Sequence, residues 1–168
     1  MHRSLVGAFI VLILAAGPAP AAGPGPAEVV QAFNSALSAR KLEDATALLA
    51  NGAVQYTLRS AHAGVTTGTG GITSDLKTHW NTIGPVLFAV TSTYRRVPKV
   101  TDTRVDGDLA TVWATVASET VERSGKRRQD SFSEVYLLVR AGDTWRIGAM
   151  ADNRGTDAMT VGSPAPAR

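Results

Sequence analysis

The C-terminal half of the sequence, residues 85–153, reads as long strands joined by turns. Glycine follows a polar residue at Asp106-Gly107 and Ser124-Gly125 and precedes Asp143 in Gly142-Asp143, and such pairs supply the positive φ angles that tight turns need. Between the turns the sequence is rich in β-branched and aromatic residues, which is typical of strands. We expect strands at residues 86–96, 100–105, 109–122, 127–140 and 145–152. Several exceed the usual length of about 5–6 residues, and long antiparallel strands allow a sheet to curl around helices.

Three helical patterns precede or interrupt these strands. Apolar residues at helical spacing predict a helix from Pro26 to about Arg40, a short second helix that Asn51-Gly52 ends, and a third that Thr73 caps and Gly84-Pro85 stops. Their apolar positions are Val29, Val30, Phe33 and Leu37; Leu42, Ala45, Leu48 and Leu49; and Ile72, Leu76, Trp80 and Ile83. A strand around Val54, Tyr56 and Leu58 lies between the second and third helices. The order predicts an α+β fold, in which three N-terminal helices pack in the concave face of a curved, mostly antiparallel sheet of about six strands, like a cone.

The ends of the chain do not fit this domain. Residues 1–21 have a positive start at Arg3, a mostly apolar run over residues 5–16 and a small-residue exit, which is the layout of a secretory signal peptide. The run is shorter than the roughly 20 residues of a membrane-spanning helix. We therefore expect export to the periplasm or the medium and no stable membrane anchor after cleavage. We expect a linker at residues 22–26, the domain at residues 27–154 and a disordered tail at residues 155–168.

Composition excludes several functions. The 168-residue chain has no cysteine, so neither a disulfide nor a lipid-modified cysteine is available. The net charge is +3, and the one basic cluster, at residues 123–128, falls on a hairpin tip without interleaved aromatic residues, so we expect no nucleic-acid binding. The Gly/Thr loop of residues 64–71 lacks the Gly-Lys-Ser/Thr ending of a phosphate loop. No Gly-x-Ser-x-Gly nucleophile elbow is present.

The turns set a trial register for the long strands. If Ser124-Gly125 is a two-residue hairpin loop, Trp113 lies opposite Tyr136 and Thr115 opposite Glu134. One face then collects the residues Trp113, Phe132, Glu134, Tyr136, Leu138, Trp145 and Ile147. A slip of one residue would exchange the two faces of a strand. The expected result is a lone glutamate among aromatic side chains on the face that covers the helices.

Both faces of the predicted sheet are fairly apolar. One face must cover the helices, and a large apolar surface is uncommon on a soluble monomer. We therefore expect a homodimer that forms through the outer face of the sheet.

The sequence resembles the nuclear transport factor 2-like superfamily, also called SnoaL-like or cystatin-like. The similarity lies in the helix pair of residues 27–33 and 41–50, in the hairpin Gly142-Asp143-Thr144-Trp145-Arg146-Ile147, and in the order of elements over about residues 26–153. The resemblance implies a cone-shaped fold with an internal pocket. It does not imply one activity, because this fold carries isomerases, cyclases, dehydratases, hydrolases, adaptors and binding modules.

The resemblance also allows a position-by-position test of catalysis. Steroid isomerases of the superfamily have a tyrosine where this chain has Phe33, and a general-base aspartate at a position that falls on Thr57 or Tyr56. Only the acid position, Glu134, keeps its chemistry. Many relatives have His and Ser on the last strand, where this chain has Ala151 and Asn153. Proton abstraction of the steroid-isomerase kind is therefore not expected.

Glu134 is the sharpest candidate, as a general acid or base or as a ligand anchor; its ordinary alternative is an exposed strand carboxylate. The expected pocket residues are Phe33, Tyr56, His79, Trp80, Trp113, Glu134 and Tyr136. Most of these would also serve as core residues, and His79 as a boundary histidine. The other histidines are His2 and His62, and with no His-x-x-x-His spacing we expect no metal site and no cofactor.

Three functions remain open at this point. The first is a module that binds a small hydrophobic ligand. The second is an isomerase, cyclase or dehydratase that uses Glu134 with help from His79 or Tyr56. The third is an accessory subunit that docks another protein on its sheet. They differ in whether Glu134 points inward and whether it has a polar partner.

Overall fold

A computed structural model describes residues 23–57 and 71–154 of the chain. The predicted signal segment, most of the Gly/Thr loop and the predicted tail lie outside these residues. Within them, no helix is both long and apolar enough to cross a membrane.

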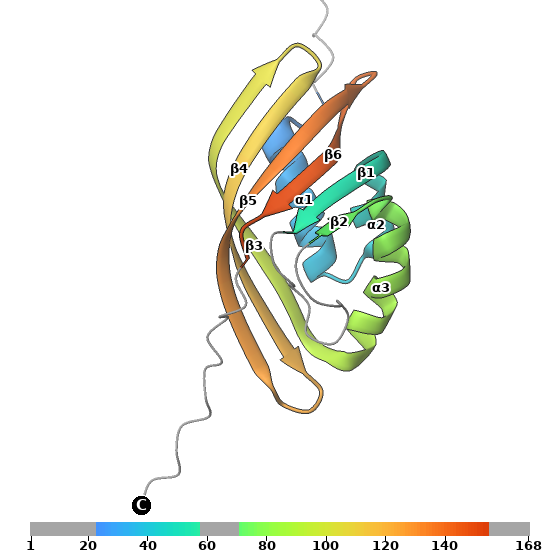
Figure 1. Ribbon diagram of the computed structural model, residues 1–168, viewed down its shortest axis with the longest axis vertical. Coiled ribbons are helices and arrows are strands. Elements are labelled where there is room, and N and C mark those ends of the chain that lie inside the picture. The colour runs from blue at the N-terminus through green and yellow to red at the C-terminus, as the bar shows by residue number, and fades with distance from the viewer. Residues whose placement is uncertain (1–22, 58–70, 155–168) are drawn as a thin grey trace, which may run out of the picture.

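The strands form one curved sheet in the order β2-β1-β6-β5-β4-β3 (Figure 1). Their bounds are β1 Leu49–Thr57, β2 Gly71–Thr73, β3 Thr91–Asp106, β4 Leu109–Glu122, β5 Arg127–Ala141 and β6 Thr144–Asp152. All neighbouring pairs are antiparallel except β1 and β6, which run parallel. The α+β class is therefore confirmed, with a mixed sheet.

The helices lie on the concave side of this sheet (Figure 1). They are α1 Pro26–Ser38, α2 Leu42–Ala47 and α3 Leu76–Val90. Helix α1 begins with a proline at its first turn, and the Glu28 carboxylate accepts a hydrogen bond from the Gly25 N–H. The apolar face of α1 (Val29, Val30, Phe33 and Leu37) is fully buried against the inner face of the sheet. The hydrophobic core thus lies between α1 and the strands β3 to β6.

Helix α3 does not stop at Gly84-Pro85, and the strand predicted from residue 86 is wrong there. The helix continues to Val90, and β3 begins at Thr91. Pro85 is exposed, so the carbonyl that it leaves without a helical partner can be hydrated. Gly84 is buried against Leu42, whose methyl groups would lie 3.0 Å from any added Cβ. This close approach of α3 to α2 favours continuation of the helix.

Strand β3 is continuous, whereas the sequence predicted two strands broken near Pro98. Proline cannot donate to a ladder, and this usually excludes it from a strand interior. Strand β3 is the last strand of the sheet order, so one of its edges has no neighbouring strand among the described residues. Pro98 is paired with Val116 of β4 in the register of the sheet. The edge position is what makes the proline compatible with the strand.

The predicted register of β4 against β5 is wrong by one residue. Val112, not Trp113, lies opposite Tyr136, because residues 123–126 form the connection and Val121 pairs with Arg127. Trp113 therefore points to the outer face, where 48% of its surface is exposed. The inner face of β5 was predicted correctly.

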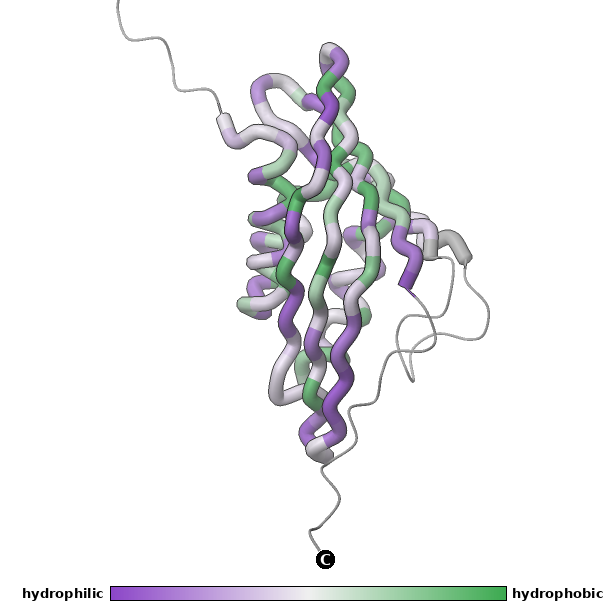
Figure 2. Tube along the Cα trace, turned by 90° about the vertical axis from the view of Figure 1, so that its left-hand side faces the viewer, coloured by the Kyte–Doolittle hydropathy of each residue, from purple (hydrophilic) through white to green (hydrophobic). Residues whose placement is uncertain are grey.

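The pairing of β5 with β6 follows the prediction only at its start. Arg140 lies opposite Trp145 and Leu138 opposite Ile147, as predicted. An irregularity between Leu137 and Leu138 then shifts the register, so Glu134 lies opposite Asp152 and not Ala151. A β-bulge adds one residue to one strand and increases its twist. Figure 2 shows the sheet from its outer side, with hydrophobic and hydrophilic residues interspersed along the strands.

The observed register predicts that replacing two neighbouring leucines by alanine lowers the free energy of unfolding by different amounts. Leu138 is 0% exposed, and Leu137 is 36% exposed on the opposite face. We expect Leu138→Ala to lower the free energy of unfolding by about 2–5 kcal/mol, because it leaves a cavity in the core. The matched variant Leu137→Ala should cost less than about 1 kcal/mol. Urea unfolding measures both, and a larger loss for Leu137→Ala would contradict the register.

Candidate functional site

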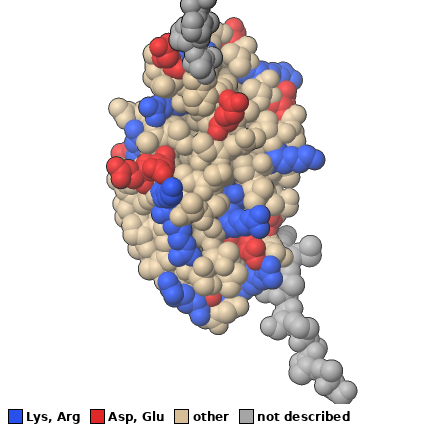
Figure 3. All heavy atoms as spheres, turned by 180° about the vertical axis from the view of Figure 1, so that it is seen from behind, with Lys and Arg blue, Asp and Glu red and all other residues tan. Residues whose placement is uncertain are grey.

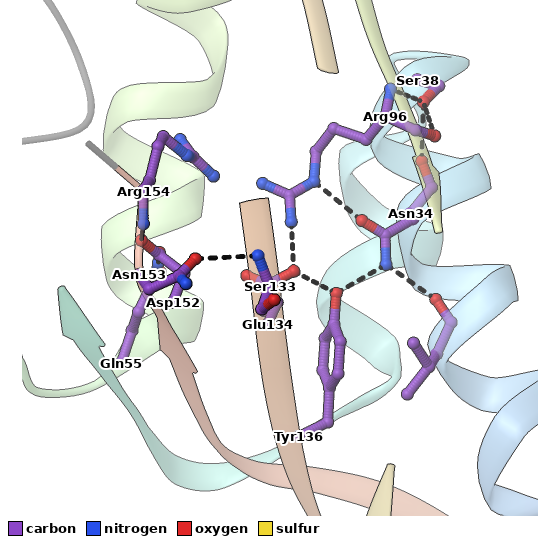
Figure 4. A network of polar contacts seen from close by, with 11 residues as sticks. Asn34, Ser38, Gln55, Arg96, Ser133, Glu134, Tyr136, Asp152, Asn153 and Arg154 are labelled. Atoms are coloured by element: carbon purple, nitrogen blue, oxygen red, sulfur yellow. Dashed lines mark hydrogen bonds and ion pairs between the residues drawn. The ribbon is translucent and has the colours of Figure 1, made fainter. Parts of the chain in front are cut away.

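The centre of the interior is an ion pair between Arg96 of β3 and Glu134 of β5 (Figure 4). Arg96 Nη2 lies 2.5 Å from Glu134 Oε2, and the two side chains are 3% and 0% exposed. The two strands flank β4, so the contact spans β4 on its inner side. Because side chains alternate between the two faces of a strand, Glu134 points to the same face of β5 as the buried residues Phe132 and Tyr136.

Tyr136 and Asn34 close this pair into a network. The Tyr136 hydroxyl donates to Glu134 Oε2, and Asn34 Nδ2 donates to the Tyr136 oxygen over 2.9 Å. Arg96 Nε donates to Asn34 Oδ1 over 2.7 Å. Ser38, one turn further along α1, accepts from the Arg96 backbone N–H and donates to its carbonyl. The network therefore joins α1 to β3 and β5, which are distant in the sequence.

The electrostatics of the network fix its protonation. Burial alone would lower the pKa of Arg96, but the Glu134 carboxylate and the nearby tyrosines raise this pKa above its ordinary value. Burial, followed by the charge of Glu134, raises the pKa of Tyr136 well above its ordinary value. Arg96 thus remains a cation, and Tyr136 remains a neutral donor in the physiological pH range. Both groups donate to the same oxygen of Glu134.

A second buried arginine, Arg154, follows the end of β6 and lies near this network (Figure 4). Its guanidinium carbon is 4.0 Å from the centre of the Phe132 ring, and that of Arg96 is 5.6 Å from the same ring. The Arg154 backbone N–H donates to Asp152 Oδ1 over 3.1 Å, and Gln55 Nε2 donates to Oδ2 over 3.2 Å. Burial, followed by repulsion from Arg96, lowers the pKa of Arg154.

Four buried side-chain polar atoms have no hydrogen-bond partner among the described residues. They are Glu134 Oε1, Arg154 Nε, Arg154 Nη2 and Trp80 Nε1. Glu134 therefore keeps a free acceptor while its other oxygen is occupied, and Arg154 keeps free donors. Chemically, these atoms can accept from and donate to a ligand that offers both a donor and an acceptor.

The structure places the predicted site residues in two groups. Phe33, Trp80, Glu134 and Tyr136 are buried in the interior. Tyr56 is 46% exposed, and Trp113 lies on the outer face, because the register of β4 differs from the predicted one. His79 is half-buried, its ring meets Trp80 edge-on, and burial lowers its pKa. No hydrogen bond joins Glu134 to His79 or Tyr56 in the described part of the chain.

Sequence reasoning missed Asn34, Arg96 and Arg154. Arg96 alternates with the buried Tyr94 along β3, and this was the available signal for it. Asn34 follows Phe33, which occupies the position of a catalytic tyrosine in the resemblance, and it supplies the hydrogen-bonding group that phenylalanine lacks.

Within residues 23–57 and 71–154, no group of three or more His, Asp or Glu residues could hold a metal ion.

Comparison with known proteins identifies the fold. No family model and no curated protein matches the chain. Among solved structures, a ketosteroid isomerase-like protein from Erwinia carotovora atroseptica superposes with a TM-score of 0.59, 12% identity and coverage of 75% of this chain and 90% of that chain. A candidate scytalone dehydratase from Novosphingobium aromaticivorans superposes with a TM-score of 0.61 and 10% identity. The match covers 82% of this chain and 85% of that chain. A candidate aromatic ring hydroxylase from the same species superposes with a TM-score of 0.60 and 14% identity. The match covers 76% of this chain and 85% of that chain.

The chain has the nuclear transport factor 2-like fold. The resemblance seen in the helix pair and the last hairpin is confirmed at the level of fold. At such low identity the likeness carries no activity across, because this fold supports many unrelated functions. The candidate site must be interpreted from its own residues.

The burial of the Arg96–Glu134 pair predicts that breaking it lowers the free energy of unfolding much more than breaking a surface ion pair does. Glu134→Gln should lower the free energy of unfolding by about 3–5 kcal/mol, because it leaves the Arg96 charge buried without a counter-charge. The matched variant Glu119→Gln removes the surface partner of Arg127 and should cost less than about 1 kcal/mol.

A double variant serves as the control for this prediction. Replacing Arg96 by Met together with Glu134 by Leu removes both charges and should recover much of the loss. Denaturant unfolding of the four proteins measures these differences. Equal small losses for Glu134→Gln and Glu119→Gln would show that the buried pair does not carry the stability assigned to it.

Proposed function

We propose that this chain is an exported module that binds a small, largely hydrophobic ligand in the interior of the fold. The observation that carries the proposal is the set of unpartnered buried polar atoms on Trp80, Glu134 and Arg154. Export is proposed from the N-terminal segment alone, and the N-terminal sequence of the chain isolated outside the cytoplasm tests it.

Unpartnered buried polar atoms are unusual in folded proteins. More than about 90% of buried polar groups are paired, and each one left unpaired costs about 1–3 kcal/mol. Four such atoms on three side chains therefore favour a partner that the described residues do not supply. The surrounding side chains are apolar and include Phe33 and Phe132, which favours a ligand with an apolar body.

An isomerase, cyclase or dehydratase is the second candidate. It is favoured by Glu134 itself, a buried carboxylate with one free oxygen and with the Tyr136 hydroxyl in hydrogen-bonding contact. Two features weigh against it. The other carboxylate oxygen is committed to Arg96, and the Glu134–Tyr136–Asn34 contacts hold α1 to the sheet. The isomerase positions for tyrosine and aspartate are also vacant in this sequence.

The indole N–H of Trp80 provides a direct test of binding. In a ¹⁵N-labelled chain beginning at residue 22, we expect neutral aromatic fragments to shift the Trp80 Nε1–H signal, because this donor is buried without a partner. The variant Trp80→Phe assigns the signal. The indole of Trp113, exposed on the outer face, is the internal control and should not move. A folded chain in which no fragment shifts the Trp80 signal would contradict the proposal.

The same ligands separate the two candidate functions. A binding module releases its ligand unchanged after prolonged incubation, and this is the expected result. Conversion of the ligand by the unsubstituted chain, with loss of conversion in folded Glu134→Gln, would favour the enzyme instead.

We also propose that the outer face of the sheet meets a second copy of the chain. This face carries the exposed apolar residues Val97, Leu109, Trp113, Leu137 and Val139. Exposed apolar residues on three neighbouring strands favour an interface, and a twofold dimer uses the same patch on both subunits. On the face seen in Figure 3, by contrast, basic and acidic side chains are interspersed, and no single sign of charge dominates.

Sedimentation equilibrium tests this association. We expect the mass of a dimer for the unsubstituted chain and of a monomer for Trp113→Glu, because the charge would be buried in the apolar interface. The control is Val86→Glu, which places the same charge at an exposed apolar position on α3 and should leave the dimer intact. A monomeric unsubstituted chain at high concentration would overturn the proposal.

A further inference from the structure

We propose that the ligand is a small apolar monocarboxylic acid whose carboxylate binds side-on to one edge of the Arg154 guanidinium. This inference rests on the proposed function and names the chemical class of its ligand. It depends on which nitrogen atoms of Arg154 are free, on the charges around them and on the side chains that they adjoin.

The free atoms of Arg154 form a binding edge. Nε and Nη2 lie on the same side of the planar guanidinium, and their N–H bonds point in parallel. Both atoms are buried without a partner among the described residues, in a side chain that is only 4% exposed. Two parallel N–H donors match the two oxygens of one carboxylate, and such bidentate pairs are among the strongest hydrogen-bonded contacts in proteins. A single water molecule would not satisfy both donors as well.

The charges around Arg154 leave its cation without a paired anion. No ion pair involves Arg154 in the described part of the chain, and the Glu134 oxygen that carries an ion pair is bound to Arg96. Asp152 lies two residues before Arg154, but its two oxygens accept from Gln55 and from the Arg154 backbone N–H. Burial and Arg96 lower the pKa of the guanidinium despite Asp152 and Glu134, which agrees with a cation that lacks full compensation. A ligand anion would supply the missing charge.

The neighbouring groups restrict the anion and its body. The guanidinium carbon lies over the Phe132 ring, 4.0 Å from its centre, so the aromatic ring occupies one side of the cation. Glu134 and Asp152 are buried nearby and would repel a second negative charge. Phosphate esters and dicarboxylates are therefore disfavoured. A single carboxylate on an aromatic or aliphatic body fits both the charge and the apolar surroundings.

Matched acids and amides provide the test. Benzoate, phenylacetate and hexanoate are each titrated against their own primary amides at pH 7, with the chain beginning at residue 22. The amide keeps the shape and loses the charge. We expect at least one acid to bind about 10- to 100-fold more tightly than its amide, which is the range expected for a charge-assisted bidentate contact. Calorimetry gives the affinities, and the Trp80 indole signal reports binding independently.

Two arginine variants connect the effect to Arg154. Arg154→Met keeps the apolar stem and should remove the preference for the acid, because the acid loses a charge-assisted contact and the amide only a neutral hydrogen bond. Its melting temperature should stay equal or rise, because the lost charge has no ion-pair partner among the described residues; a purely structural arginine would show a clear decrease. Arg95→Met, at an exposed position of β3, is the control and should keep the preference.

The possible failures are distinguishable. Equal binding of acids and amides, or an unchanged acid preference in Arg154→Met, would overturn the carboxylate assignment and leave the binding function standing. If neither acids nor amides bind and no neutral fragment shifts the Trp80 signal, the proposed function itself fails. Loss of stability in Arg154→Met together with equal binding would assign Arg154 to the fold alone.

Discussion

The buried ion pair between Arg96 and Glu134 is the contact on which the interior of this protein depends. A pair of charges removed from water is tolerated only when each charge is compensated and its remaining hydrogen bonds are made. Arg96 meets this condition through Glu134 and Asn34. Glu134 meets it for one oxygen only. The second oxygen, Glu134 Oε1, has no partner among the described residues, and it is the atom of the pair that the proposed ligand would contact.

The interior polar groups of this chain are arranged around Asn34 and two arginines. Phe33 cannot donate a hydrogen bond, but the neighbouring Asn34 binds both Tyr136 and Arg96. The glutamate is thus held as a structural acceptor between strands. Arg154, which lies beyond the last strand, brings a second cation to the same region, and no carboxylate in residues 23–57 and 71–154 forms an ion pair with it. Two arginines and an aromatic ring give the interior a recognition chemistry that differs from a plain proton-transfer site.

The sequence predicted part of this well, for identifiable physical reasons. The alternation along β5 placed Glu134 and Tyr136 on the inner face, because side chains in a strand alternate without exception over a regular stretch. The register of β4 could not be predicted, because the length of the connection at Ser124-Gly125 sets it, and a change of one residue moved Trp113 to the outside. The two prolines led to wrong predictions of a helix end and a strand break. Pro85 is tolerated because it is exposed on a helix, and Pro98 because it is on the last strand of the sheet order. Arg96 and Arg154 were missed because a buried arginine is recognisable only once its partners are known.

The central claim is that the interior holds polar groups whose partners come from outside the protein's own side chains. A crystal structure of the chain from residue 22, determined at a resolution at which ordered water is visible, tests it most directly. The account predicts non-protein density within hydrogen-bonding distance of the Nε–Nη2 edge of Arg154 and of Glu134 Oε1, with the Arg96–Glu134 pair intact. An Arg154 guanidinium paired with a carboxylate of the chain itself, or a Glu134 side chain turned toward solvent, would contradict it.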